Sequence, residues 1–168
     1  MTKTAIVADS GPLIALALIE QLDVLRQLYP RVLLPPAVWH EVTVKGMGMP
    51  GAQAIRQLSW LEIIKPEPQV LQPLSILVDP GEAEAIALAQ TVTGSIVLLD
   101  DSQARRVAER FNVPRIGTVG ILRRAKKAGL LTAIKPYILY LQANNIYISD
   151  KLAEAVLRDV GEWDGDLH

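Results

Sequence analysis

Short apolar runs alternate with stretches of helical periodicity along most of the chain. Residues 4–8, 32–34 and 95–99 are apolar runs with the length of buried strands, and residues 115–117 predict a shorter one. Elsewhere apolar residues recur every three or four positions, as they do from 104 to 111, which is typical of helices that pack on one face. Strands that alternate with helices favour a parallel sheet with helices on both sides. The pattern therefore predicts an α/β fold.

Proline and glycine mark where the remaining elements begin and end. Pro36 suits the first turn of a helix, and Asp79-Pro80 followed by Glu82 predicts a helix with a capping box. Residues 65–80 contain four prolines and are expected to be extended. Residues 60–64 predict a further strand. We expect one domain over residues 1–160, a frayed tail at 161–168, and helices after Pro12, around 22–28, and at 37–45, 52–58, 79–92, 104–111, 118–128, 134–144 and 150–160.

Composition narrows the chemistry without identifying a partner. The 168 residues carry a formal net charge of −1, so overall charge indicates neither a nucleic acid nor a membrane. The chain has no cysteine and two histidines, which excludes thiolate zinc sites, cysteine nucleophiles and a histidine-rich metal centre. Residues 9–12 interrupt the first apolar stretch, so it is neither a signal peptide nor a membrane span. We expect a cytoplasmic protein without membrane association.

Acidic residues follow the predicted strands at the edge where parallel sheets bind ligands. Asp9 follows the first strand, and Asp100 and Asp101 follow a later one. Helices that follow parallel strands begin at this same edge. Glu41 lies about two turns into one such helix, and Glu82 lies in the first turn of another. Four separate segments are thus expected to bring carboxylates to one rim.

Glu41 gives the strongest reason to expect a metal ion. It lies at the border of the apolar stripe of its helix, where a carboxylate is partly desolvated and needs a cation or a donor. Clustered carboxylates also raise one another's pKa, and a bound divalent cation relieves this repulsion. Oxygen ligands without His or Cys select Mg²⁺ or Mn²⁺, and such ions can orient a water for attack on a phosphodiester.

These residues resemble the motifs of the PIN-domain nucleases, the fold of VapC-like toxins. The first acid is followed by Ser, as in Asp9-Ser10, and the second ends a P-x-x-V-x-x-E-like helix, PPAVWHE, at Glu41. The third and fourth positions match GEAEAIALA, which contains Glu82 and Glu84, and LLDD. The similarity is greatest to a prokaryotic subfamily with GEAEAIALA, a DD pair before an AR dipeptide, and GTVGIL-like segments, and it extends from about residue 4 to 160.

The resemblance implies a PIN-like three-layer α/β/α domain with a central, mostly parallel sheet and C-terminal helices. It implies an endoribonuclease that uses Mg²⁺ or Mn²⁺, forms a homodimer and is silenced by a small antitoxin protein. Which member of each acidic pair holds metal stays open. The resemblance assigns catalysis to five carboxylates: Asp9, Glu41, Glu82, Asp100 and Asp101. All of them except Glu41 are expected to be metal ligands. Ser10 and Glu84 are expected to support these ligands from beside them.

Each acid also has a structural explanation. Asp9 can simply belong to a turn, because the sequence Asp-Ser-Gly-Pro at residues 9–12 is common in turns. Asp101 can cap the next helix, and Glu82 can complete a capping box. Glu84 can lie on a solvated face, and Ser10 can be a turn hydroxyl, because no histidine is placed to activate it. Only the joint position of the acids favours the metal site.

Three other features have weaker signals. Residues 46–51, GMGMPG, match the dinucleotide pattern G-x-G-x-x-G, but Pro35-Pro36 favours a helix before them, so we expect a loop. His40 is expected to be exposed on its helix, and Thr118 is expected to cap the helix that it begins. A phosphoacceptor domain using Asp9 would need a lysine at that carboxylate, and the sequence offers no compelling one.

Basic residues gather between residues 102 and 127. The stretch contains eight Arg or Lys and a single acid, Glu109. It predicts either two solvated helix faces or a phosphate track beside the acidic rim. The second interpretation assigns RNA binding to four arginines: Arg105, Arg106, Arg123 and Arg124. The alternative to an endonuclease is a catalytically weak PIN-like module that binds RNA or protein.

Overall fold

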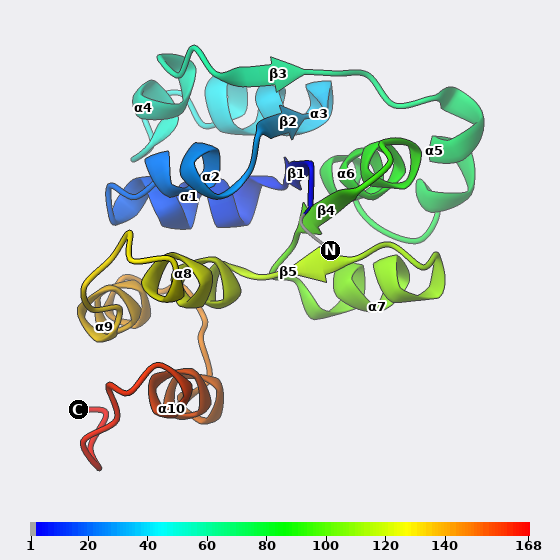
Figure 1. The fold of residues 1–168 in the computed structure, drawn as a ribbon. Helices are drawn as coiled ribbons and strands as arrows, with labels where there is room; N and C mark the ends of the chain where they lie inside the picture. Colours follow the sequence, from blue (N-terminus) through cyan, green and yellow to red (C-terminus); the bar gives the residue numbers. More distant parts are fainter. Residues whose placement is uncertain (1–2) are drawn as a thin grey trace.

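The computed structural model describes residues 3–168 and contains a five-stranded sheet (Figure 1). The pairings between neighbouring strands are all parallel, so the carboxyl ends of the strands share one edge. The order runs outward from β1 in both directions, and ligands bind such sheets where the order reverses, here between the ends of β1 and β4. The sheet has the order β3-β2-β1-β4-β5, formed by β1 (Ala5–Ala8), β2 (Arg31–Leu34), β3 (Leu61–Ile63), β4 (Ser95–Leu98) and β5 (Arg115–Ile116).

Helices cover both faces of the sheet. Figure 1 shows α1, α2 and α8 on one side and α5, α6 and α7 on the other, with α9 and α10 beyond α8. The helices are α1 (Ser10–Leu18), α2 (Asp23–Leu28), α3 (Pro36–His40), α4 (Ala52–Arg56), α5 (Pro68–Leu74), α6 (Pro80–Thr91), α7 (Ser102–Arg110), α8 (Thr118–Lys127), α9 (Lys135–Ala143), α10 (Asp150–Asp159) and the π-helical segment η1 (Glu41–Lys45).

Alternate residues of each strand enter different cores. Ile6 and Ala8 of β1 pack in the core that α1, α2, α8, α9 and α10 share, whereas Ala5 and Val7 pack in a second core with α5, α6 and α7. All four side chains are fully buried, because a strand covered on both faces exposes neither. The expected three-layer α/β/α arrangement is confirmed. Every helix within residues 3–168 is too short or too polar to span a lipid bilayer.

The proline-rich stretch differs from its expected extended path, because it contains α5. Pro68 begins this helix, where its missing N–H would have had no helical partner. Pro73 lies inside the helix near its end, yet the next residue, Leu74, is fully buried. Val70 and Leu71 pack against the same core. Burial of these side chains outweighs the penalty that led us to expect an extended chain.

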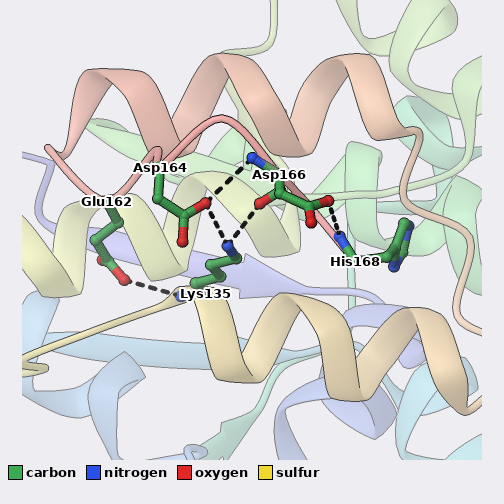
Figure 2. Close-up of polar contacts among 5 residues, drawn as sticks. All are labelled: Lys135, Glu162, Asp164, Asp166 and His168. Carbon is green, nitrogen blue, oxygen red and sulfur yellow. Dashed lines mark hydrogen bonds and ion pairs between the residues drawn. The ribbon is translucent and has the colours of Figure 1, made fainter.

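The last residues, which we expected to fray, have defined contacts with α9 (Figure 2). The Glu162 carboxylate accepts hydrogen bonds of 2.9 to 3.1 Å from the main-chain N–H groups of Ile134 and Lys135. The ammonium of Lys135 lies 2.9 Å from the Asp164 carboxylate, and Leu167 is buried. A carboxylate is favourable at a helix N-terminus, where free N–H groups and the helix dipole meet it. These contacts hold the tail against α9.

Candidate metal centre

Asp9 is the buried carboxylate of the acidic edge. It follows β1 at the N-cap position of α1, is 7% exposed, and makes no capping hydrogen bond with its side chain. Its buried Oδ1 has no hydrogen-bond partner within residues 3–168. Burial is the main reason that the pKa of Asp9 is raised to about 7. The neighbouring charges of Asp79, Glu41 and Asp100 raise it further, against a hydrogen bond from the Ser10 N–H.

Glu41 lies where the helix after β2 changes its winding. It begins η1, and the N–H of Gly46 bonds to its carbonyl at 2.9 Å in the wider π-helical turn. Such turns are rare and occur frequently at functional sites. The Ser10 hydroxyl donates to Glu41 Oε2 at 2.9 Å, and a Cβ at Gly81 would collide with the Glu41 carboxylate. Residues of α1 and α6 therefore hold Glu41 at the edge of the sheet.

Asp79 and Glu82 form the expected capping box at the start of α6. Asp79 Oδ1 accepts the Glu82 N–H at 2.8 Å, and Glu82 Oε1 accepts the Asp79 N–H at 3.3 Å. The capping role expected for Glu82 is thus confirmed. The capping box uses one oxygen of each carboxylate, Asp79 Oδ1 and Glu82 Oε1. Burial raises the pKa of Glu82 to about 7, and the charges of Asp79, Asp9 and Asp101 contribute. Glu82 is therefore both a cap and a member of the acidic group.

Asp79 is the acid that sequence reasoning left out of the site. We assigned it only as an N-cap, although its charge raises the pKa of both Asp9 and Glu82. The available signal was its position, since the N-cap of a helix that follows a parallel strand lies at the ligand edge.

Asp100 and Asp101 make different contacts. Asp100 Oδ1 accepts the Thr118 N–H at 2.8 Å, and its Oδ2 accepts the Thr118 hydroxyl at 2.5 Å. Asp101 Oδ2 accepts the Ala104 N–H at 2.9 Å as the N-cap of α7, so its expected capping role is confirmed. The expectation that Thr118 caps α8 is wrong, because Gly117 occupies the N-cap and Thr118 instead orients Asp100.

Glu84 contacts the helix that carries Glu41. Its Oε1 accepts the Ala37 N–H at 3.0 Å in the first turn of α3. This bond satisfies one of the free N–H groups at that helix start. Glu84 is half-buried, so it does not lie on a solvated face as the structural explanation expected.

The acidic edge fits a hard cation by its chemistry, without forming a ready-made cluster. Across residues 3–168, no three His, Cys, Asp or Glu side chains converge closely enough to hold a metal ion. Like charges repel, and main-chain N–H groups hold Asp79, Glu82 and Asp101 in their capping positions. The partnerless Asp9 Oδ1 and the all-oxygen donor set nevertheless suit Mg²⁺ or Mn²⁺.

Comparison with known families identifies the domain. A family model described as a PIN domain matches residues 5–162, which include the whole sheet and all ten α-helices of the described chain. The chain belongs to the PIN-domain family. PIN domains are generally nucleases and typically use divalent metals. No curated protein matches the chain.

Two of the four arginines assigned to RNA are engaged within this PIN domain. The Arg123 guanidinium lies 2.5 Å from the Asp159 carboxylate of α10. Arg124 lies over the Tyr29 ring, 6.0 Å from its centroid, and donates to the Tyr29 hydroxyl at 3.2 Å. The Asp159 carboxylate neutralises Arg123, and the Tyr29 hydroxyl occupies a donor of Arg124. The spacing of these arginines in the sequence could not reveal partners so distant along the chain.

The other two arginines lie on α7. Arg105 donates to the Leu99 carbonyl at 2.8 Å. Burial lowers the pKa of Arg105, the charge of Arg115 lowers it further, and Asp100 opposes the change. Arg106 is exposed and forms no ion pair within residues 3–168.

Proposed function

We propose that this PIN domain is an endoribonuclease that depends on Mg²⁺ or Mn²⁺. The observation that carries the proposal is Asp9, a buried carboxylate with a partnerless oxygen and a pKa raised to about 7 among other acids. A fold does not maintain such a group for stability, since a buried charge without a partner is unfavourable. A cation would compensate it, and the family to which the chain belongs generally cleaves nucleic acid.

In this proposal four carboxylates, Asp9, Glu82, Asp100 and Asp101, hold the metal. A bound divalent ion would stabilise the charge that develops on the phosphodiester. Glu41 accepts the proton of the attacking water, because its Oε2 is already fixed by the Ser10 hydroxyl and leaves Oε1 for the water. Thr118 keeps Asp100 in place through both of its carboxylate oxygens.

The biological setting is also a proposal. The resemblance of the motifs to VapC-like toxins supports RNA as the substrate, a small antitoxin as a partner and a homodimer as the assembly. The absence of cysteine suits a reducing compartment such as the cytoplasm. Leu152, Val156 and Val160 form an apolar stripe that favours self-association. Val156 is buried inside the domain, whereas Leu152 is 48% exposed, so only part of the stripe is free to contact a second copy.

A catalytically weak binding module is the second candidate. It is favoured by the absence of a converged metal cluster within residues 3–168 and by the capping bonds of Glu82 and Asp101. Incubation of purified protein with single-stranded RNA, in manganese and in chelator, separates the two. The endonuclease predicts cleavage in manganese alone, and Asp9→Asn should abolish it. Binding without cleavage under any divalent ion would establish the module instead.

A further inference from the structure

A cavity of about 580 Å³ opens beside the acidic edge, between α8, α10 and the loop that joins α9 to α10. This volume is in the range of pockets that bind small molecules. Asp100 and Thr118 line one part of it, so the cavity is continuous with the candidate metal centre. Tyr147 and Leu152, from the loop and from α10, also line it. The site thus extends from the metal centre toward the C-terminal helices.

The cavity has a positive wall. Arg105 and Arg115 both line it, and Arg115 is close enough for its charge to lower the pKa of Arg105. Arg115 has one ion-pair partner within residues 3–168, Glu109, at 3.3 Å, and that carboxylate is 66% exposed. Arg123 also lines the cavity, but it is paired with Asp159. A phosphate group beside Arg105 and Arg115 would relieve their mutual repulsion, and guanidinium groups bind phosphate with two parallel hydrogen bonds.

An exposed aromatic ring lies in the same cavity. Tyr147 is 90% exposed, and Leu152 beside the cavity is 48% exposed. A lone exposed tyrosine needs no explanation, but an exposed ring in a cavity lined by arginines has the two features that bind single-stranded nucleic acid. Positive charge contacts the backbone, and the ring stacks on a base. A duplex cannot offer an unstacked base to this ring.

We propose that this cavity binds one nucleotide of single-stranded RNA next to the scissile phosphate, with its base on Tyr147 and its phosphate beside Arg105 and Arg115. The identity of the ligand as RNA rests on the proposed function. The binding itself does not require cleavage, because the cavity wall and the metal centre use different side chains apart from Asp100 and Thr118.

The test measures binding of a short fluorescein-labelled single-stranded RNA to the full chain by anisotropy, with chelator present so that no cleavage occurs. Tyr147→Ala should weaken binding by about tenfold, the loss expected for one stacked base, and Tyr147→Phe should bind like wild type. Tyr140→Ala is the matched control, because Tyr140 is 49% exposed on α9 and does not line this cavity. Arg115→Gln should weaken binding and reduce its dependence on salt.

Two results would overturn the proposal. One is equal RNA affinity of wild type and Tyr147→Ala, which is also the outcome if a protein segment occupies the cavity. The other is competition by duplex RNA as effective as by the single strand. Cleavage in manganese is scored separately. Tyr147-dependent binding without cleavage supports the cavity and refutes the nuclease, whereas cleavage with unchanged binding by Tyr147→Ala refutes the cavity alone.

Discussion

Asp9 is the residue on which the proposed metal centre depends most. The residue stands at an N-cap position but leaves its side chain uncapped, and its Oδ1 is buried without a partner within the described chain. Asp79 and Asp101, by contrast, each accept an N–H of the helix that they cap. The proposed metal role of Asp9 therefore rests on its burial and its partnerless oxygen, whereas Asp101 also has a structural role as a cap.

Asp9→Asn should give a folded protein that no longer cleaves RNA. The change removes a buried charge, so the melting temperature in chelator should rise at pH 8, while the stabilisation by manganese should shrink because a ligand is lost. Activity should fall by more than about 100-fold, since even side chains that only support metal ligands contribute 10- to 100-fold. Asp23→Asn, an exposed acid of α2, is the control. Wild-type cleavage by Asp9→Asn would refute the assignment.

The raised pKa values of Asp9 and Glu82 predict how stability depends on pH. Their ordinary values are 3.8 and 4.5, and in the fold both are raised to about 7. The folded protein therefore binds these protons more tightly than the unfolded chain does. The resulting stability is complete below the ordinary values and is lost as the pH rises through about 7. In chelator the melting temperature should fall across this window.

Manganese should reverse this trend, because a cation competes with the two protons. The manganese-induced rise in melting temperature should increase over the same pH window. Thermal melts of wild type and of the double variant Asp9→Asn/Glu82→Gln, with chelator and with manganese, measure both effects. A wild-type profile as flat as that of the double variant would mean that neither carboxyl holds its proton in the fold.

Among the elements, those with strong periodicity could be predicted from the sequence and those that depend on distant contacts could not. The strands 4–8 and 95–99 lie as expected, at Ala5–Ala8 and Ser95–Leu98, because a buried strand needs a continuous apolar run. Helix α5 was missed because the burial of Leu74 against the second core outweighs its prolines. Contacts such as Thr118 with Asp100 join segments whose side-chain geometry no local pattern contains.

The close approach of α6 to Glu41 can be tested with a pair of glycines. Gly81 and Gly11 are both the second residue of their helices, α6 and α1. A Cβ at Gly81 would collide with the Glu41 carboxylate, whereas a Cβ at Gly11 would meet nothing within 4 Å. Gly11→Ala should raise the melting temperature by no more than about 1–3 °C, because the gain in helix propensity is partly offset by crowding between the new Cβ and Pro12.

Gly81→Ala should lack this gain and should lower the rate of RNA cleavage by about 10- to 100-fold, because the displaced Glu41 loses its position beside Ser10. Circular dichroism and melts establish that both variants fold. The prediction fails if the two variants cleave RNA at the same rate, since α6 would then have no influence on Glu41.

For the whole molecule, the decisive feature is where charge remains after the chain has folded. The formal net charge of −1 says little about partners. The structure pairs Arg123, Lys126 and Lys127 of the basic stretch with acids, and it places Arg124 over Tyr29. Arg115 has one acidic partner, Glu109, whose carboxylate is 66% exposed. The sequence showed a basic stretch between residues 102 and 127, but only the fold shows which of its side chains are engaged by acids.

Arg106 and Arg110 offer a matched test of that availability. Both are exposed on α7 and have no ion-pair partner within residues 3–168, but Arg106 lies one turn nearer to Asp101 and the acidic edge. If RNA crosses this edge, Arg106→Ala should reduce the slope of log K against log salt by about 0.7, the contribution of one phosphate contact in a single strand. Arg110→Ala should leave the slope unchanged, because its side chain lies toward the opposite edge of the sheet.

Anisotropy titrations over a series of salt concentrations, in chelator, give both slopes. Equal slopes for the two variants would show that α7 contributes a solvated surface and that RNA takes another path across the domain.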